Sequence, residues 1–250
     1  MAKILCLSYY IALENFQIAA AAARLAENII RRELLKMTKD VRRRWCDLIG
    51  ERTAQTLRKH YFDAVYCMSA EEAAARILHM ISPEDCVGWG GLATMEALGI
   101  QEMLRARGQR LIDQKLAVIP EESEEMRRQS LLCDTFLCGA NAVTEDGQLV
   151  NMDSLGNRVA ALLYGPRQVI VAAGINKICK STQEGIARIR DIAAPINAQK
   201  FPLRGLPCFL TGTCVDCSHR ESLCSQLVIT RMSRPEGRIK VVLVGEVLGF

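Results

Sequence analysis

The sequence is poor in aromatic residues, has little net charge and contains no long apolar run. Phe, Trp and Tyr make up 5% of the 250 residues, so the core must rest on Leu, Ile, Val and Ala. No run approaches the roughly 18 apolar residues that a membrane-spanning helix needs, and no membrane span is predicted. The formal net charge is +4, and the basic run Arg42–Arg44 is interpreted as a solvated helix face rather than a nucleic-acid site.

Cysteine, in contrast, is abundant, with 11 residues. These cysteines do not have the pattern of a disulfide framework. Their number is odd, and Cys67, Cys86 and Cys133 lie inside apolar runs, where a thiol behaves as a small apolar side chain. Because disulfides belong mainly to oxidising compartments, we predict a reducing compartment, the cytoplasm.

The first 36 residues differ from the remainder of the chain. Residues 1–13 faintly resemble a signal peptide, but Glu14 follows at once and no clean cleavage site precedes the alanine tract. We interpret Phe16–Lys36 as an Ala-rich helix. Residues 1–36 are then an extension, either a non-core part of the protein or upstream sequence included by a misassigned start. The main domain is predicted to cover residues 37–250.

From about residue 38 onward, helical and β-type segments alternate. β runs are predicted over Ala64–Met68, Cys86–Trp89, Arg110–Ile112, Thr135–Cys138, Gln168–Ala173, Leu227–Thr230 and Ile239–Gly245, with a hairpin at Asp146-Gly147. Helices are predicted up to about Tyr61 and over Ala70–Ile81, Thr94–Arg107, Glu121–Cys133, Asn157–Leu163 and Thr182–Ile192, the last ending before Pro195. This alternation predicts an α/β fold, a mainly parallel sheet with helices on both faces.

A glycine-rich turn, Gly88–Thr94, joins one predicted strand to the next helix. Glycines at Gly90 and Gly91 let backbone N–H groups approach an anion closely, and Thr94 would cap the helix and contact a phosphate. The competing interpretation is a tight turn capped by Thr94 with no ligand.

Further polar residues follow later strands, where ligands of parallel sheets bind. Glu145 is a candidate nucleophile or general base, and a solvated turn residue in the competing interpretation. Asp153 is a candidate ligand-binding residue and also a candidate helix cap, and the two roles are compatible. The remaining candidates are amides and cations that would bind an anion or satisfy local backbone groups: Asn141, Arg158, Asn176 and Lys177.

Four cysteines are concentrated in a loop over residues 205–225. Cys208, Cys214, Cys217 and Cys224 have the spacing C-x5-C-x2-C-x6-C. Four thiolates suit tetrahedral zinc or an iron–sulfur cluster, although the spacing is that of neither a zinc ribbon nor a ferredoxin. The alternative is a group of reduced thiols or a redox pair.

These motifs closely resemble those of the LUD-domain (lactate utilisation) family. The resemblance covers about residues 38–250 and is strongest over Asn141–Lys177, Ala193–Ala198 and Val244–Gly249. It includes the run N-x-D-x-x-G-N-R-V-A at Asn151–Ala160 and G-x-N-K at Gly174–Lys177. In the glycine turn Leu92 stands where the family usually has Ser, which removes one hydroxyl from the proposed anion site.

The resemblance implies a fold of the ribose-5-phosphate isomerase and CoA-transferase type. It also implies a role in bacterial lactate utilisation, alongside iron–sulfur subunits that oxidise lactate to pyruvate. Three hypotheses follow: a protein that binds a small anionic metabolite in this pathway, a metal-binding electron-transfer or structural module, and a CoA-transferase-like or sugar-phosphate-isomerase-like enzyme. The third depends on Glu145, which with Gly147 matches the E-x-G turn of CoA transferases.

Overall fold

The structure, a computed structural model, describes residues 28, 31, 36–202 and 205–250. The chain divides into two compact units, Met1–Trp45 and Cys46–Phe250. In the first unit residues 36–45 are helical, and the predicted helix Phe16–Lys36 lies almost entirely outside the described residues. The predicted domain boundary between residues 36 and 37 stays a prediction.

The second unit is built on a six-stranded sheet in which every neighbouring pair is parallel. The strand order is β1-β10-β7-β4-β2-β3. Its strands are β1 (Asp63–Cys67), β2 (Cys86–Gly90), β3 (Arg110–Ile112), β4 (Thr135–Gly139), β7 (Gln168–Gly174) and β10 (Ile239–Val244). All six overlap the β runs predicted from the sequence.

Side chains of the sheet alternate between two cores. In β7, Val169 and Val171 belong to one core, and Ile170 and Ala172 belong to the other. The first core is covered by the helix over residues 46–59 and by α6 (Asn157–Leu163). The second is covered by α2 (Ala70–Met80), α3 (Ala93–Ala97) and α4 (Ile100–Ala106). The predicted α/β architecture, with helices on both faces, is confirmed.

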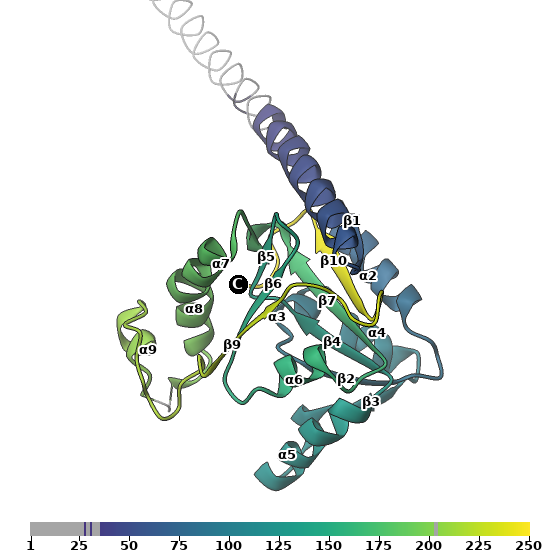
Figure 1. Cartoon of the computed structure of the whole chain (residues 1–250), viewed down its shortest axis with the longest axis vertical. Helices are drawn as coiled ribbons and strands as arrows, with labels where there is room; N and C mark the ends of the chain where they lie inside the picture. Colours follow the sequence, from purple (N-terminus) through teal and green to yellow (C-terminus); the bar gives the residue numbers. More distant parts are fainter. Residues whose placement is uncertain (1–27, 29–30, 32–35, 203–204) are drawn as a thin grey trace, which may run out of the picture. The chain divides into compact units, whose positions relative to one another are not determined.

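A second, smaller sheet is added to this frame, and it was not predicted. Its order is β8-β5-β6-β9, with β5 (Ala142–Thr144), β6 (Leu149–Asp153), β8 (Ile178–Cys179) and β9 (Gln226–Thr230). β5 and β6 form the hairpin predicted at Asp146-Gly147, where Gly147 has a φ of 86°. Figure 1 shows α7 (Thr182–Arg188) and α8 (Ala194–Ala198) beside this sheet, and a small core including Val150 and Ile189 joins them.

Two predicted helices are wrong in extent. The helix expected over Thr94–Arg107 is interrupted at Gly99, which adopts a φ of 67° between α3 and α4. The helix expected to end before Pro195 instead continues through a π-helical turn, Ile189–Ala193, into α8. Pro195 lies at the start of α8, directly after this π-helical turn.

The helix expected over Glu121–Cys133 is also shorter than predicted. α5 covers Pro120–Gln129, and a 3-10 turn, Ser130–Leu132, follows it. α5 has no buried residue, and its acidic first turn is followed by Arg127 and Arg128 in its last turn, as the helix dipole favours.

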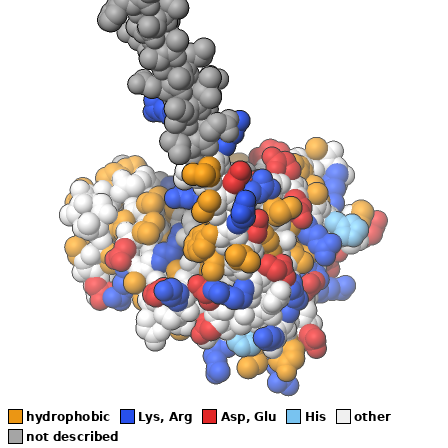
Figure 2. All heavy atoms as spheres, turned by 90° about the horizontal axis from the view of Figure 1, so that it is seen from above, with side chains coloured by type: hydrophobic (Ala, Val, Ile, Leu, Met, Phe, Trp, Pro, Cys, Tyr) orange, Lys and Arg blue, Asp and Glu red, His pale blue; other side chains and the backbone are white. Residues whose placement is uncertain are grey.

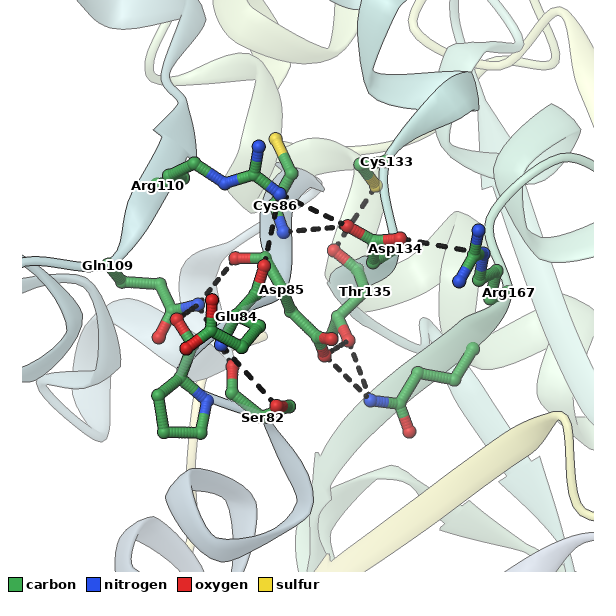
Figure 3. Close-up of polar contacts among 12 residues, drawn as sticks. Ser82, Glu84, Asp85, Cys86, Gln109, Arg110, Cys133, Asp134, Thr135 and Arg167 are labelled. Carbon is green, nitrogen blue, oxygen red and sulfur yellow. Dashed lines mark hydrogen bonds and ion pairs between the residues drawn. The ribbon is translucent and has the colours of Figure 1, made fainter.

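At the amino ends of β2, β4 and β7, polar side chains in the strands and next to them form a hydrogen-bond network (Figure 3). The Thr135 hydroxyl donates to the Asp85 carboxylate at 2.6 Å and accepts from the Gln168 amide at 2.6 Å. Close by, the Asp134 carboxylate accepts the backbone N–H of Cys86 at 2.9 Å. Polar groups at this edge therefore satisfy one another, which leaves the carboxyl edge as the place for a ligand.

The distribution of charged side chains on the surface is consistent with the small net charge of the sequence. Acidic and basic side chains are interspersed on the face seen in Figure 2. None of the helices among the described residues combines the length and apolar character that crossing a membrane requires. The ten cysteines that the structure describes are all free thiols.

Candidate functional site

The carboxyl ends of β2 and β4 form a topological switch point. The two strands are neighbours, but the chain leaves β2 for α3 on one face of the sheet and leaves β4 for the β5–β6 hairpin and α6 on the other. Divergent connections of this kind open a crevice where α/β proteins bind ligands. A cavity of about 310 Å³ lies there, lined by residues 91–93, 127, 139–141, 152–155, 157–158, 177, 197, 200–201, 223 and 250.

Lys177 is the most unusual residue in the lining. It ends the 3-10 turn Ile175–Lys177 that follows β7, and it is only 3% exposed. Its Nζ donates to the Thr94 hydroxyl at 2.7 Å and to the Ala140 carbonyl at 3.1 Å. Burial, together with the positive charges of Arg188 and Arg158, lowers the pKa of Lys177 from 10.5 to about 7.

Arg158 explains why the turn after β2 needs glycine. Gly91 has a φ of 64°, and a Cβ there would lie 2.6 Å from the Arg158 Cδ. The buried guanidinium donates to the carbonyls of Met152 at 2.6 Å and Gly139 at 3.3 Å, and to the Asn141 side chain at 3.0 Å. Its Nε–H has no hydrogen-bond partner among the described residues. Gly91 is therefore required because the Arg158 side chain packs against it, whether or not a ligand binds in the cavity.

Asn141 and Asp153 have well-defined structural roles beside Arg158. The Asn141 Oδ1 also accepts the backbone N–H of Met152 at 2.9 Å. The Asp153 Oδ2 accepts the N–H of Val159 at 3.2 Å, in the first turn of α6, although the N-cap residue of that helix is Gly156 and not Asp153. Both residues also line the cavity, so the structural and ligand-binding interpretations are compatible here.

Thr94 does not cap the helix after the glycine turn, contrary to the prediction. α3 begins at Ala93, its N-cap is Leu92, and no side chain caps it. Thr94 lies inside the helix, fully buried, and its hydroxyl accepts from Lys177. Gly90 is outside the cavity lining. A Cβ at Gly90 would lie 3.2 Å from the Phe136 ring, so its role is close packing.

Asn176 holds the last residues of the sequence. Its Oδ1 accepts the N–H of Leu248 at 3.1 Å, and its Nδ2 donates to the Gly249 carbonyl at 3.4 Å. Asn176 does not line the cavity, but it positions the segment that includes Phe250, which does. A Cβ at Gly249 would lie 3.1 Å from the Lys177 Nζ, so this segment packs directly on the buried amine.

Glu145 lies apart from this group. Its carboxylate forms an ion pair with Arg52, and its backbone N–H donates to the Cys179 carbonyl at 2.8 Å. Glu145 is not part of the cavity lining. Its catalytic role stays a prediction, without support from its position.

Among the lining residues that the sequence analysis did not identify, three stand out by their chemistry. They are Arg127 in the last turn of α5, Lys200 after α8, and Phe250. The Lys200 Nζ lies 4.8 Å from the centre of the Phe250 ring, a cation–π distance. Arg127 is paired with Glu124 at 3.0 Å within α5. Nothing in the local pattern separates either cation from a solvated helix residue, so no sequence signal identifies them.

The charges around the cavity are strongly unbalanced. Three cationic side chains from three separate segments line it, Arg127, Arg158 and Lys200, and the partly protonated Lys177 is a fourth basic group. Asp153 has the single side-chain carboxylate among the lining residues. Such a lining favours an anion.

The four clustered cysteines lie around a second, smaller cavity of about 70 Å³. Cys208 in α9 (Pro207–Thr211), Cys214, Cys217 and Cys224 all line it. The Cys214 Sγ accepts the backbone N–H of Asp216 at 3.4 Å. Burial, and then the neighbouring thiols, raise the pKa of Cys224 to about 11. Within the described part of the chain, no three His, Cys, Asp or Glu side chains are already arranged to hold a metal ion.

The two cavities share a wall. Met152 and Leu223 line both of them. The wall is fixed by two hydrogen bonds: the Ser154 hydroxyl donates to the Ser222 carbonyl at 2.9 Å, and the Ser225 N–H donates to the Asp153 carbonyl at 2.9 Å. The cysteine loop is thus part of the larger site's surroundings.

Comparison with known proteins identifies the family. The LUD domain model matches residues 50–244. A DUF162 family protein from Deinococcus radiodurans is similar in structure, with a TM-score of 0.49 and 15% identity over 80% of this chain and 98% of that one. The eIF2B delta protein of Chaetomium thermophilum gives a TM-score of 0.33 and 14% identity, over 47% of this chain and 50% of its own. No curated protein has a matching sequence. Since the family model spans most of the sequence, the chain belongs to the LUD domain family.

Proposed function

We propose that this chain binds a small anionic metabolite in the cavity at the carboxyl ends of β2 and β4, and that it serves lactate oxidation in the cytoplasm together with iron–sulfur subunits. The observation that carries the proposal is the lining of three cationic side chains, Arg127, Arg158 and Lys200, against one acidic side chain, Asp153. Family membership supports an association with lactate utilisation at the level of the family.

The size and chemistry of the cavity favour a short carboxylate. A volume of about 310 Å³ is at the small end of ligand sites. The Arg127 side chain is partly exposed, so it can turn from Glu124 toward a ligand in the cavity. An arginine guanidinium binds a carboxylate through two parallel hydrogen bonds. The Nε–H of Arg158 adds a buried donor without a partner among the described residues.

Calorimetric titration tests this proposal. We expect lactate or pyruvate to bind, and the uncharged analogue lactamide to bind at least about tenfold more weakly, because a charge-assisted hydrogen bond is worth more than about 1.4 kcal/mol. Arg127→Gln should weaken binding similarly. Arg128→Gln is the matched control, because Arg128 is the next residue of α5 and lies outside the cavity lining. Equal affinity of the two variants, or no binding of either acid, would contradict the proposal.

We also propose that Cys208, Cys214, Cys217 and Cys224 hold zinc or an iron–sulfur cluster. The observation in favour is that all four thiols line one small cavity. Thiolates are soft donors that suit both groups, and metal binding is commonly coupled to local folding. The loop would therefore have to close on the metal, because the described thiols are not already arranged as a metal centre.

Metal content after anaerobic purification tests this second proposal. We expect either stoichiometric zinc or iron with acid-labile sulfide in the wild-type protein. A variant with all four cysteines changed to Ser should lose it, whereas Cys179→Ser should retain it, because Cys179 lies in β8, outside the thiol cavity. A wild-type protein with neither metal would refute the proposal.

A further inference from the structure

The Lys177 amine is bonded in a way that suits its neutral form. A neutral amine has two N–H donors and a lone pair, whereas an ammonium group has three donors. Among the described residues the Nζ has two acceptors, the Thr94 hydroxyl at 2.7 Å and the Ala140 carbonyl at 3.1 Å. At 3% exposure, a third N–H would find little water. Two acceptors leave the lone pair of a neutral amine free.

The surroundings of Lys177 also favour the neutral form of its amine. Burial is the main cause of the lowered pKa of about 7, and Arg188 and Arg158 add to it. The one neighbour that would favour the ammonium form is the Cys138 thiol. Burial raises the pKa of that thiol to about 12, so it carries no charge at neutral pH. Above about pH 7 the neutral, nucleophilic form of Lys177 therefore predominates.

A nucleophilic amine in a cation-lined cavity fits one class of ligand. The cations of the lining suit a carboxylate, and the Lys177 amine lines the same cavity, where it could meet a carbonyl carbon next to that carboxylate. A 2-oxo acid carries both groups. We propose that Lys177 captures the carbonyl carbon of a 2-oxo acid as a Schiff base. The inference rests on the anion-binding function proposed above.

The step balances without an oxidant or a cofactor. The Nζ lone pair attacks the keto carbon, the carbonyl π electrons move to oxygen, and a proton passes from nitrogen to that oxygen, giving a carbinolamine. The C–O bond then breaks as the C=N bond forms, and the oxygen leaves as water with a second proton from nitrogen. The Thr94 hydroxyl, 2.7 Å from the Nζ, is placed to relay these protons.

Reductive trapping tests the inference. The full chain is incubated with pyruvate and sodium borohydride, followed by intact mass measurement and peptide mapping. We expect a mass gain equal to pyruvate less one oxygen atom, located on Lys177. Lys180, three residues further along and exposed, is the matched lysine. At pH 8 labelling of Lys177 should exceed that of Lys180 by more than about tenfold, because an ordinary lysine is almost wholly protonated there.

Three controls separate the outcomes. Lactate has no carbonyl and should give no adduct, Lys177→Met should give none, and Lys180→Met should label like wild type. If Lys177→Met does not fold, the lysine that carries the adduct in the wild-type protein, found by peptide mapping, decides whether the inference holds. Pyruvate that binds in the calorimeter but labels no lysine, or labels Lys180 as fully as Lys177, overturns the Schiff base and leaves anion binding standing. If neither lactate nor pyruvate binds, both proposals fail.

Discussion

The free energy of unfolding of the wild-type chain should rise, relative to that of Lys177→Met, by about 2 kcal/mol between about pH 7 and about pH 9. The cause is the buried amine of Lys177. In the folded chain its pKa is lowered from 10.5 to about 7, first by burial and then by Arg188 and Arg158. Urea denaturation of both variants across this pH range measures the difference.

The sign follows from proton counting. Between about pH 7 and about pH 10.5 the unfolded chain keeps the Lys177 proton and the folded chain has lost it. Because the unfolded state binds more protons, stability rises with pH in this window. The stabilisation is lost as the pH falls toward about 7. Below that value the folded amine also binds its proton and the dependence flattens.

Two controls isolate the effect. Buried thiols such as Cys138, whose pKa rises from 9.0 to about 12, favour the folded state less as the unfolded thiols ionise, so the window stops near pH 9. Subtracting the variant from the wild type removes that contribution, since both contain the same cysteines. Lys180→Met should give a difference independent of pH. A flat difference for Lys177→Met would mean that its amine is charged in the folded chain.

Replacing Arg158 with Met should destabilise the fold by about 3–5 kcal/mol, the usual cost of removing one partner from a buried charge network. Three acceptors lose their donor: the carbonyls of Gly139 and Met152 and the Asn141 side chain. The Asp153 carboxylate, 3.8 Å from the guanidinium, loses its counter-charge. Chemical denaturation of the two proteins measures the loss.

Arg128→Met is the matched control for this change. Arg128 is paired with Glu124 at 3.2 Å on the exposed surface of α5. Such a pair contributes less than about 1 kcal/mol. Losses of similar size in the two variants would show that the Arg158 network adds no more than a surface pair.

The sheet could be predicted because its strands are buried on both faces. Continuous apolar runs such as Val169–Ala173 fit no other element of that length. In the second sheet the β5–β6 hairpin and β9 match predicted segments, but β8 has only two residues, too few to predict, and the joining of these strands into a separate sheet was not predicted. The helix through Pro195 was missed because the preceding π-helical turn has no local signal.

Most of the candidate site could be predicted where its residues follow strands. Gly91, Asn141 and Lys177 lie within three residues of the ends of β2, β4 and β7, and parallel strands bring their carboxyl ends to one edge. Arg127 in α5 and Lys200 after α8 also line the cavity, and such surface cations look alike in sequence whether they face solvent or a ligand. Tertiary packing alone selects them.

The wall shared by the two cavities would make the occupants proposed for them energetically dependent on each other. Met152 and Leu223 contact both spaces, and the hydrogen bonds of Ser154 and Ser225 join the cysteine loop to the edge of the anion cavity. Any change of the loop that moves this wall alters the affinity for an anion. Equilibrium then demands that the anion alter, by the same factor, the affinity of the loop for whatever it holds. The thiol cluster would thus act as a sensor of the neighbouring metabolite.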